Sequence, residues 1–233
     1  MVDLLNLNRL YLQEDDRGSF CEADAEEQKA FVQMIKERFR AKEESDIYYY
    51  ADGTHPTHNT RFTYAWIKKG KGLEQPTLWA VGTQVNINGL LNAHDVIDVI
   101  AHECPSVNVD SIMALYKAAL EKHPEAESIF YIITDNARYY LSKKLREWVE
   151  GTKIKQIFLP PYSPNLNLIE RLWKFLRKKI INTKFYRTKH EFRDAVLKSF
   201  DNIASYQKET RVASNSELPR DQFAIHFWLT IRN

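Results

Sequence analysis

The sequence predicts an α/β protein in which helices pack on the faces of one mixed β-sheet. Three observations support this prediction. Strand-like segments follow one another in the first half of the chain, and strand-like and helix-like segments alternate in the second half. The 233 residues are enough for one large domain with a sizeable core. The chain has 7 glycines and lacks both a repeat and a Gly/Ser linker, so we expect one compact unit.

The first half begins with a predicted helix and continues with predicted strands. Residues 24–44 place apolar side chains at helical spacing behind an acidic first turn. Residues 47–52 (IYYYAD) form a short β-rich run that ends in an acid. Residues 61–72 and 77–91 are predicted to be two strands joined by a basic turn that contains glycine, and residues 96–101 are a candidate for a further short strand.

Helices and strands alternate in the second half. Residues 128–135 (SIFYIITD) are a continuous run of β-branched and aromatic residues, which is typical of a strand buried on both faces. The helix that contains Glu170 is expected to bury a stripe made of Ile169, Leu172, Trp173, Leu176 and Ile180. The other expected elements are a helix at 109–124 capped by Asp110 or Ser111, a helix at 137–150 stopped by Gly151, a strand at 154–160 and a helix at 188–206. In such sheets active sites gather outside the carboxyl ends of the strands.

Three acids stand where such a site is expected. Asp52 and Asp135 each follow a predicted strand, so both project from a strand end. Each also has a structural interpretation, because Asp commonly begins a turn and Asp135 could cap the following helix. Glu170 could be a metal ligand, form a capping box with Asn167 or pair with Lys174 four residues on. The residues alone leave these alternatives open.

Charge is distributed unevenly along the chain, although the net charge is only +2. Residues 1–50 hold 7 Lys and Arg against 12 Asp and Glu, which gives −5. Residues 151–200 hold 12 against 3, which gives +9. A basic block of this kind is typical of polyanion-binding proteins, since Lys and Arg neutralise phosphates. A solvated helix face can be equally basic, so charge alone does not decide between the two.

The cysteines and the hydropathy pattern point to a cytoplasmic protein. Cys21 and Cys104 are isolated and far apart, which suits a reducing compartment better than a disulfide framework. No apolar run approaches the roughly 20 residues that a membrane helix needs, and the N-terminus lacks the pattern of a signal peptide. We therefore expect a cytoplasmic location and no membrane partner; that the cytoplasm is bacterial is implied only by the family resemblance described next.

Two blocks of the sequence carry a resemblance to a known family. The segment 135–179, with PPYSPNLNLIE at 160–170, resembles the catalytic core of the DDE transposases, in particular the bacterial insertion-sequence branch of the Tc/mariner superfamily. Residues 51–71 (ADGTHPTHNTRFTYAWIKKGK) are similar to the block around that family's first catalytic aspartate. The resemblance runs from about residue 24 to about residue 205. Leu168, where Pro is usual, and Tyr140, where His is usual nearby, depart from the family pattern.

The resemblance implies a fold, a reaction and a set of site residues. The fold is the RNase H-like fold of retroviral integrases, with a mixed five-stranded sheet and helices on both faces. Asp52, Asp135 and Glu170 would be the catalytic triad and would bind two Mg²⁺ or Mn²⁺ ions, the hard cations that carboxylate oxygens prefer. The activity implied is metal-dependent cleavage and strand transfer of DNA, by phosphodiester hydrolysis and transesterification. A purely hydrolytic RNase H-like nuclease and an inactive or domesticated DNA-binding relic remain alternatives.

The same resemblance suggests supporting residues and a domain division. His55 and Asn136 are candidates for a role behind the metal ligands. The candidates for contacts with DNA phosphates are Arg171, Lys174, Arg177, Lys178, Lys179, Lys68 and Lys69. We expect an acidic N-terminal extension with one helix at 1–45, the catalytic domain at 46–206 and a C-terminal tail of unknown role at 207–233. Expected partners are DNA, as transposon ends and target, together with a second copy of the chain and a companion chain that carries helix-turn-helix DNA recognition.

Overall fold

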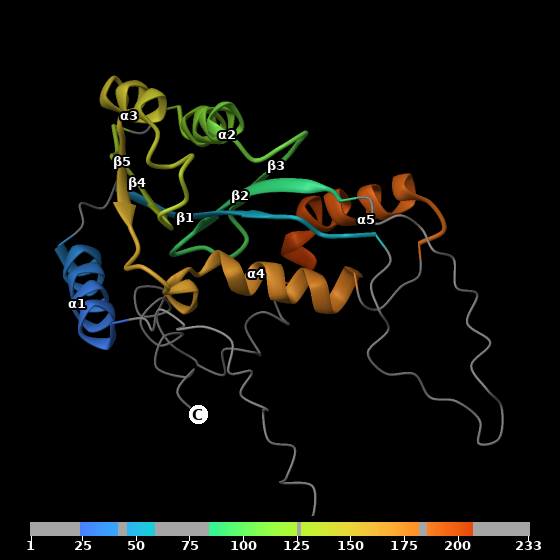
Figure 1. Cartoon of the computed structure of the whole chain (residues 1–233), viewed down its shortest axis with the longest axis horizontal. Helices are drawn as coiled ribbons and strands as arrows, with labels where there is room; N and C mark the ends of the chain where they lie inside the picture. The colour runs from blue at the N-terminus through green and yellow to red at the C-terminus, as the bar shows by residue number, and fades with distance from the viewer. Residues whose placement is uncertain (1–23, 42–45, 59–83, 125–126, 182–185, 207–233) are drawn as a thin grey trace, which may run out of the picture.

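The computed structural model describes residues 24–41, 46–58, 84–124, 127–181 and 186–206. In these residues one mixed sheet has the strand order β3-β2-β1-β4-β5 (Figure 1). The strands are β1 (Ile47–Thr54), β2 (Asn86–Asn92), β3 (Val99–Cys104), β4 (Phe130–Thr134) and β5 (Ile154–Phe158). The first three strands form an antiparallel meander, and β4 lies parallel to both β1 and β5. The predicted mixed five-stranded sheet is confirmed.

Helices cover both faces of the sheet, as the sequence predicts (Figure 1). The helices α2 (Val109–Lys122) and α3 (Lys143–Glu150) pack on one face. On the other face lie α1 (Ala25–Ala41), α4 (Ile169–Leu176) and α5 (Lys189–Asp201). No helix among the described residues is both long enough and apolar enough to cross a membrane.

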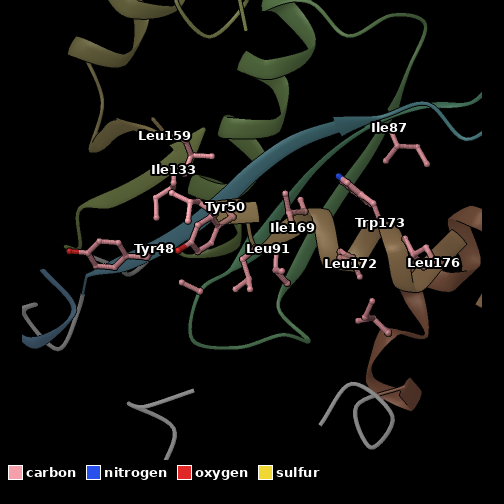
Figure 2. Packing of buried hydrophobic residues seen from close by; sticks show 14 of the residues in the cluster. Tyr48, Tyr50, Ile87, Leu91, Ile133, Leu159, Ile169, Leu172, Trp173 and Leu176 are labelled. Carbon is pink, nitrogen blue, oxygen red and sulfur yellow. The ribbon is translucent and has the colours of Figure 1, made fainter. Parts of the chain in front are cut away.

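The alternation of side chains along β1 separates the two cores. Tyr48 and Tyr50 join the core on the α4 side, whereas Tyr49 and Ala51 join the core on the α2 side. Figure 2 shows the α4-side core, in which the two tyrosines lie near Ile133 and the buried side chains of α4 follow one another along the sheet. By the same alternation, the next residue of β1, Asp52, belongs to the α4 side.

Two helices begin at other residues than the sequence suggests. The N-cap of α2 is Asn108, and Ser111 is the third helical residue, whose side chain completes a capping box. The prediction that Asp110 or Ser111 is the cap is therefore wrong. The helix α3 begins at Lys143 because the Ser142 hydroxyl accepts a hydrogen bond from the backbone N–H of Leu145. The predicted start at residue 137 is therefore wrong, and a turn precedes the helix.

A π-helical turn, Arg177–Ile181, follows α4 and changes which residue is buried. A π-turn adds one residue to the helical repeat. The buried residue after Leu176 is consequently Ile181, whereas Ile180, which the helical pattern places in the buried stripe, is only partly buried. The other four residues of the predicted stripe are buried.

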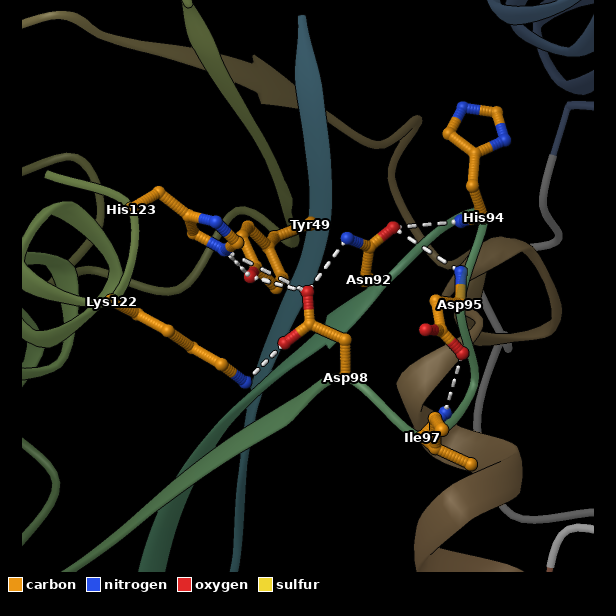
Figure 3. Close-up of polar contacts among 8 residues, drawn as sticks. All are labelled: Tyr49, Asn92, His94, Asp95, Ile97, Asp98, Lys122 and His123. Carbon is orange, nitrogen blue, oxygen red and sulfur yellow. Dashed lines mark hydrogen bonds and ion pairs between the residues drawn. The ribbon is translucent and has the colours of Figure 1, made fainter. Parts of the chain in front are cut away.

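A polar network on the α2 side joins the sheet to the end of α2 (Figure 3). Its centre is Asp98, which directly precedes β3. One oxygen of Asp98 accepts hydrogen bonds from the Tyr49 hydroxyl at 2.7 Å and from Asn92 Nδ2 at 2.8 Å. The other oxygen forms an ion pair with Lys122, and His123 Nε2 lies 2.9 Å from the Tyr49 hydroxyl. Burial raises the pKa of Tyr49, so this network holds a neutral tyrosine.

Several predicted segments lie outside the described residues. They are the strand at 61–72, most of the N-terminal extension and the C-terminal tail. The predicted strand at 77–91 is described from residue 84 on, where it forms β2, and the short strand expected at 96–101 forms β3 slightly further along the chain.

Candidate active site

The first two acids lie near the carboxyl ends of neighbouring parallel strands, but the expectation that Asp52 ends its strand is wrong, because β1 continues to Thr54. Tyr50 of β1 pairs with Ile133 of β4. Asp52 comes two residues after Tyr50 within β1, and Asp135 comes two residues after Ile133, directly after the end of β4. The two carboxylates therefore leave the sheet at the same edge. Asp52 is buried, with 8% of its surface exposed, and Asp135 is half-buried.

The third acid comes from α4, which lies across the same face of the sheet. Ile169 and Trp173 anchor the helix in the core, and Glu170 between them is half-buried. Asp52, Asp135 and Glu170 line one cavity of about 380 Å³. The rest of its lining includes Asn136, the proline-rich turn after β5, and Asn167. Three acids that are separated by at least 34 intervening residues in the sequence are thus brought to one cavity.

The two structural interpretations of Glu170 are not seen. The N-cap of α4 is Leu168 and forms no side-chain cap, so Glu170 is not part of a capping box with Asn167. Among the described residues the Glu170 carboxylate forms neither a hydrogen bond nor an ion pair, and Lys174 does not pair with it. Glu170 therefore presents its charge to the cavity.

The electrostatics of the cavity are those of crowded carboxylates. Burial, and next the charge of Glu170, raise the pKa of Asp52 to about 7, and the charge of Asp135 adds to this effect. Hydrogen bonds from the Gly53 backbone and from Trp173 act in the opposite direction and lower it. The charged groups that act on Asp52 are the carboxylates of Glu170 and Asp135, so a cation would relieve the repulsion.

Trp173 has a role at the site that the sequence pattern does not reveal. Its indole N–H donates a hydrogen bond to Asp52 Oδ2 at 2.9 Å. The ring lies against Gly89, the residue of β2 that pairs with Asp52. A Cβ on Gly89 would stand 2.6 Å from Trp173 Cη2, so only glycine lets the ring approach this closely. Helical spacing correctly predicts that Trp173 is buried, but it carries no signal for the hydrogen bond.

Asp135 and Asn136 secure the end of β4. Asp135 Oδ1 accepts a hydrogen bond from the backbone N–H of Ala137 at 3.0 Å, which forms a turn. Asn136 Nδ2 donates to the carbonyl of Leu159 at 2.8 Å and so ties β4 to the residue after β5. Asp135 caps no helix, because α3 begins only at Lys143. Asn136 therefore reaches the cavity, as the sequence suggests, with its amide already engaged.

His55 lies apart from the cavity. Its Nδ1 donates to Asn86 Oδ1 at 2.8 Å, since Asn86 uses its own amide N–H to bond the carbonyl of Pro105 at 2.7 Å. His55 is exposed and is not among the residues that line the cavity. The structure therefore does not bring His55 into contact with the three acids.

The basic residues after Glu170 differ in exposure. Arg171 is half-buried, and burial lowers its pKa to about 10, so it stays charged at neutral pH. The exposed residues form what we call the basic patch: Lys174, Arg177, Lys178 and Lys179. Lys68 and Lys69 lie outside the described residues, so the structure says nothing of their position.

An exposed aromatic side chain, Tyr162, stands in the turn that lines the cavity. It is 64% exposed and has a positive φ of 54°, which is uncommon for a residue other than glycine. The next residue holds the turn, because the Ser163 hydroxyl donates to the Pro161 carbonyl at 3.0 Å and accepts from Gln28 Nε2 of α1 at 2.9 Å. The Pro and Ser content predicts a turn here, but not the conformation of Tyr162.

The donor set of the cavity suits a hard divalent cation, although the acids do not form a closed cage. Carboxylate oxygens are the ligands that Mg²⁺ prefers, and Mg²⁺ usually keeps several of its waters. The part of the chain that the structure describes contains no group of three or more His, Cys, Asp or Glu side chains arranged to hold a metal ion. The three carboxylates and the volume of the cavity therefore fit a cation that keeps some of its waters.

Comparison with known proteins agrees with the fold. The family described as DDE superfamily endonuclease matches residues 47–193. No curated protein matches the chain by sequence.

Three solved structures illustrate the fold. The Mos1 mariner paired-end complex with Mn has a TM-score of 0.60 at 13% identity, over 90% of this chain and 61% of that one. The Mos1 transposase paired-end complex with left transposon end has a TM-score of 0.59 at 13% identity, over 93% of this chain and 62% of that one. The catalytic domain of Mos1 mariner transposase has a TM-score of 0.55 at 10% identity, over 90% and 91%. The chain thus spans about three fifths of the two larger proteins, and the likeness shows a shared RNase H-like fold.

Proposed function

The chain belongs to the DDE superfamily of endonucleases, and we propose that Asp52, Asp135 and Glu170 are its catalytic triad. One observation carries this proposal: three carboxylates from β1, β4 and α4 line a single cavity. The raised pKa of Asp52 supports it, because it reflects burial and, next, the charge of Glu170, and a cation would compensate both. We propose Mg²⁺ or Mn²⁺ as the cation, with two ions in each site.

Asp52 and Glu170 differ in how firmly their side chains are held. Asp52 is buried in the sheet and held by Trp173, so it would supply a fixed oxygen. Glu170 is half-buried and its carboxylate forms no hydrogen bond or ion pair with another described residue, so its longer side chain can adjust. Bound between these acids, divalent cations would stabilise the attacking and leaving oxygens of an in-line displacement at phosphorus. This chemistry requires no covalent bond between the protein and the DNA.

We propose that the substrate is DNA and that the chain both cuts and joins strands in transposition. The basic patch begins four residues after Glu170 and would contact DNA phosphates, which positions the duplex without reading its sequence. The Mos1 structures described as paired-end complexes support this substrate. A second copy of the chain and a companion chain with sequence-specific DNA recognition are the proposed protein partners. A cytoplasmic, bacterial location stays a prediction.

The test compares metal binding with DNA chemistry in the same set of proteins. Wild type, Asp52→Asn, Asp135→Asn and Glu170→Gln are titrated with Mn²⁺ by calorimetry in the presence of a short duplex. They are then incubated with labelled DNA ends and a supercoiled target plasmid. Glu147→Gln, an exposed acid of α3, is the matched control. We expect each triad variant to lose Mn²⁺ affinity and product, and the control to retain both.

The products distinguish the alternatives. Joined DNA ends in the target plasmid support strand transfer. Nicked plasmid without joined ends would identify a hydrolytic nuclease. Unchanged DNA affinity in all variants, with neither metal binding nor product in wild type, would identify a DNA-binding relic and refute the proposal.

A further inference from the structure

Two polar contacts flank Glu170 along the chain, and both reach β1. Asn167 Nδ2 donates a hydrogen bond to the carbonyl oxygen of Ala51 at 3.2 Å. Trp173 Nε1 donates to Asp52 Oδ2 at 2.9 Å. Asn167 lies in the turn just before α4, and Trp173 lies in the helix three residues after Glu170. Glu170 therefore lies between two bonds that fasten its helix to the strand of Asp52.

Both contacts are buried, and the contact of Asn167 with Ala51 requires the amide nitrogen, not the amide oxygen, to face the carbonyl. Asn167 and Trp173 are each 4% exposed and Asp52 is 8% exposed. If the Asn167 amide were flipped, its oxygen would face the Ala51 carbonyl oxygen and the hydrogen bond would be lost. In the present orientation Asn167 Oδ1 is buried with no partner among the described residues, so the side chain holds this position at an energetic cost.

The backbone of Asn167 adds a third connection. Its carbonyl oxygen accepts a hydrogen bond from the backbone N–H of Glu170 at 3.1 Å. Asn167 thus bonds the residue before Asp52 through its side chain and Glu170 through its main chain. A shift of α4 along the sheet would break the bond from Asn167 to Ala51 together with the indole bond to Asp52.

The sheet is shaped to receive the indole ring. Gly89 pairs with Asp52 across β1 and β2, and a Cβ there would lie 2.6 Å and 2.9 Å from two ring atoms of Trp173. The ring is therefore seated directly on the backbone beside Asp52. A phenylalanine would fill much of the same apolar space, but only a ring with an N–H can hold the carboxylate.

We propose that Asn167 and Trp173 are positioning residues that fix the separation between Asp52 and Glu170, and that Gly89 is required to seat Trp173. This inference rests on the proposed function of the two acids. Neither residue needs to touch the cation or the DNA. Asp135 is held separately, by its bond to the backbone of Ala137. Asn167 and Trp173 therefore position two of the three acids, Asp52 and Glu170.

The positioning of Asp52 and Glu170 affects metal binding because the affinity for a cation depends on the geometry of its ligands. Mg²⁺ demands near-ideal octahedral geometry. Partners that orient metal ligands typically change metal affinity by about 10- to 100-fold when they are mutated. Loss of either bond should therefore weaken Mn²⁺ binding by about tenfold or more, even though both residues lie behind the ligands.

The test separates the hydrogen bond from the packing of the ring. Trp173→Phe removes the N–H and part of the ring. Site-specific replacement of Trp173 by benzothienylalanine keeps the ring's shape and removes only the N–H. Asn167→Ala removes the bond to Ala51. Each variant is titrated with Mn²⁺ by calorimetry, and its Tm is measured in EDTA.

Matched controls make the same chemical changes on the opposite face of the sheet. Trp148→Phe alters a partly buried tryptophan of α3. Asn88→Ala alters a fully buried asparagine that bonds Ser111. We expect both controls to retain the wild-type Mn²⁺ affinity, whatever they do to Tm.

The expected result is a Mn²⁺ affinity about tenfold lower or more for the three variants, including the benzothienylalanine protein, whose Tm should stay closest to that of wild type. Unchanged Mn²⁺ affinity in the benzothienylalanine protein would show that Trp173 only packs, and would overturn the inference. Glu170→Gln, measured alongside, separates a failure of the positioning inference from a failure of the proposed function. If it also binds Mn²⁺ like wild type, the proposed function itself fails.

Discussion

Replacing Asp52 by Asn is expected to stabilise the folded protein at pH 8 while it removes metal binding. Asn keeps the size of Asp, and its oxygen can still accept the hydrogen bond from the Trp173 indole. Its amide N–H groups face a cavity lined by the carboxylates of Asp135 and Glu170. The substitution therefore removes a buried charge from an acidic cluster and adds a donor to it.

The magnitude follows from the pKa of Asp52, which is raised from 3.8 to about 7. A difference of about 3 between the folded and unfolded pKa values corresponds to about 4 kcal/mol. The folded state binds this proton more tightly than the unfolded state does. Asp52 therefore reduces the stability of the wild type progressively as pH rises from about 4 to about 7, and the loss is complete above that range. We expect the variant to be about 2 to 4 kcal/mol more stable at pH 8, and little different at pH 4.

The assay is thermal unfolding followed by circular dichroism from pH 4 to pH 8.5, in EDTA. For a chain of this size about 1 kcal/mol corresponds to about 2 to 4 °C in Tm, so a rise of about 5 to 10 °C is expected at pH 8. Adding Mg²⁺ should raise the Tm of wild type and leave that of the variant unchanged. A Tm difference that does not change with pH, or a variant less stable than wild type at pH 8, would refute the account of Asp52 as an uncompensated buried charge.

Three further predictions concern the sheet, the polar network and the DNA surface. Gly89→Ala should reduce the free energy of unfolding in urea by about 1 to 3 kcal/mol, because its Cβ would collide with Trp173; Gly151→Ala, whose Cβ would meet only ordinary contacts, is the control. Tyr49→Phe should cost about 1 to 2 kcal/mol in the same assay through its lost bond to Asp98, with Mn²⁺ affinity unchanged. Replacing Lys174 and Arg177 together by Ala should lower the slope of log K for DNA against log salt by about 2, and an unchanged slope would place the DNA elsewhere.

The sheet was predictable because its determinants are local or short-range. The two Tyr-, Phe- and Ile-rich runs define β1 and β4; Asp135 directly follows β4, and Asp52 lies two residues before the end of β1. The helical stripe of α4 places Glu170 beside the core, which is enough to bring it to the same cavity. Residue pattern and family resemblance therefore located all three acids, although their catalytic role stays a prediction.

The remaining features depend on contacts between distant segments or on competition between local bonds. The bond from Trp173 to Asp52 needs the glycine on β2, and nothing in the spacing of α4 points to that strand. The start of α3 is decided by the Ser142 cap, which prevails over a helical pattern that begins earlier. The π-turn after α4 moves the buried position to Ile181, a shift that a regular helical projection cannot anticipate.

The contact between α1 and the cavity has a consequence for designing fragments of this protein. Gln28 braces the turn that carries Tyr162 through Ser163, and Phe31 and Ile35 of α1 are buried against the sheet. A fragment that begins at residue 46, where the resemblance suggests that the catalytic domain begins, would expose the apolar residues that α1 covers. It would also leave the turn beside the cavity without its hydrogen bond from Gln28. The shortest expressible unit should therefore start before Asp24, and crystallisation or screening efforts that trim the acidic segment should stop short of this helix.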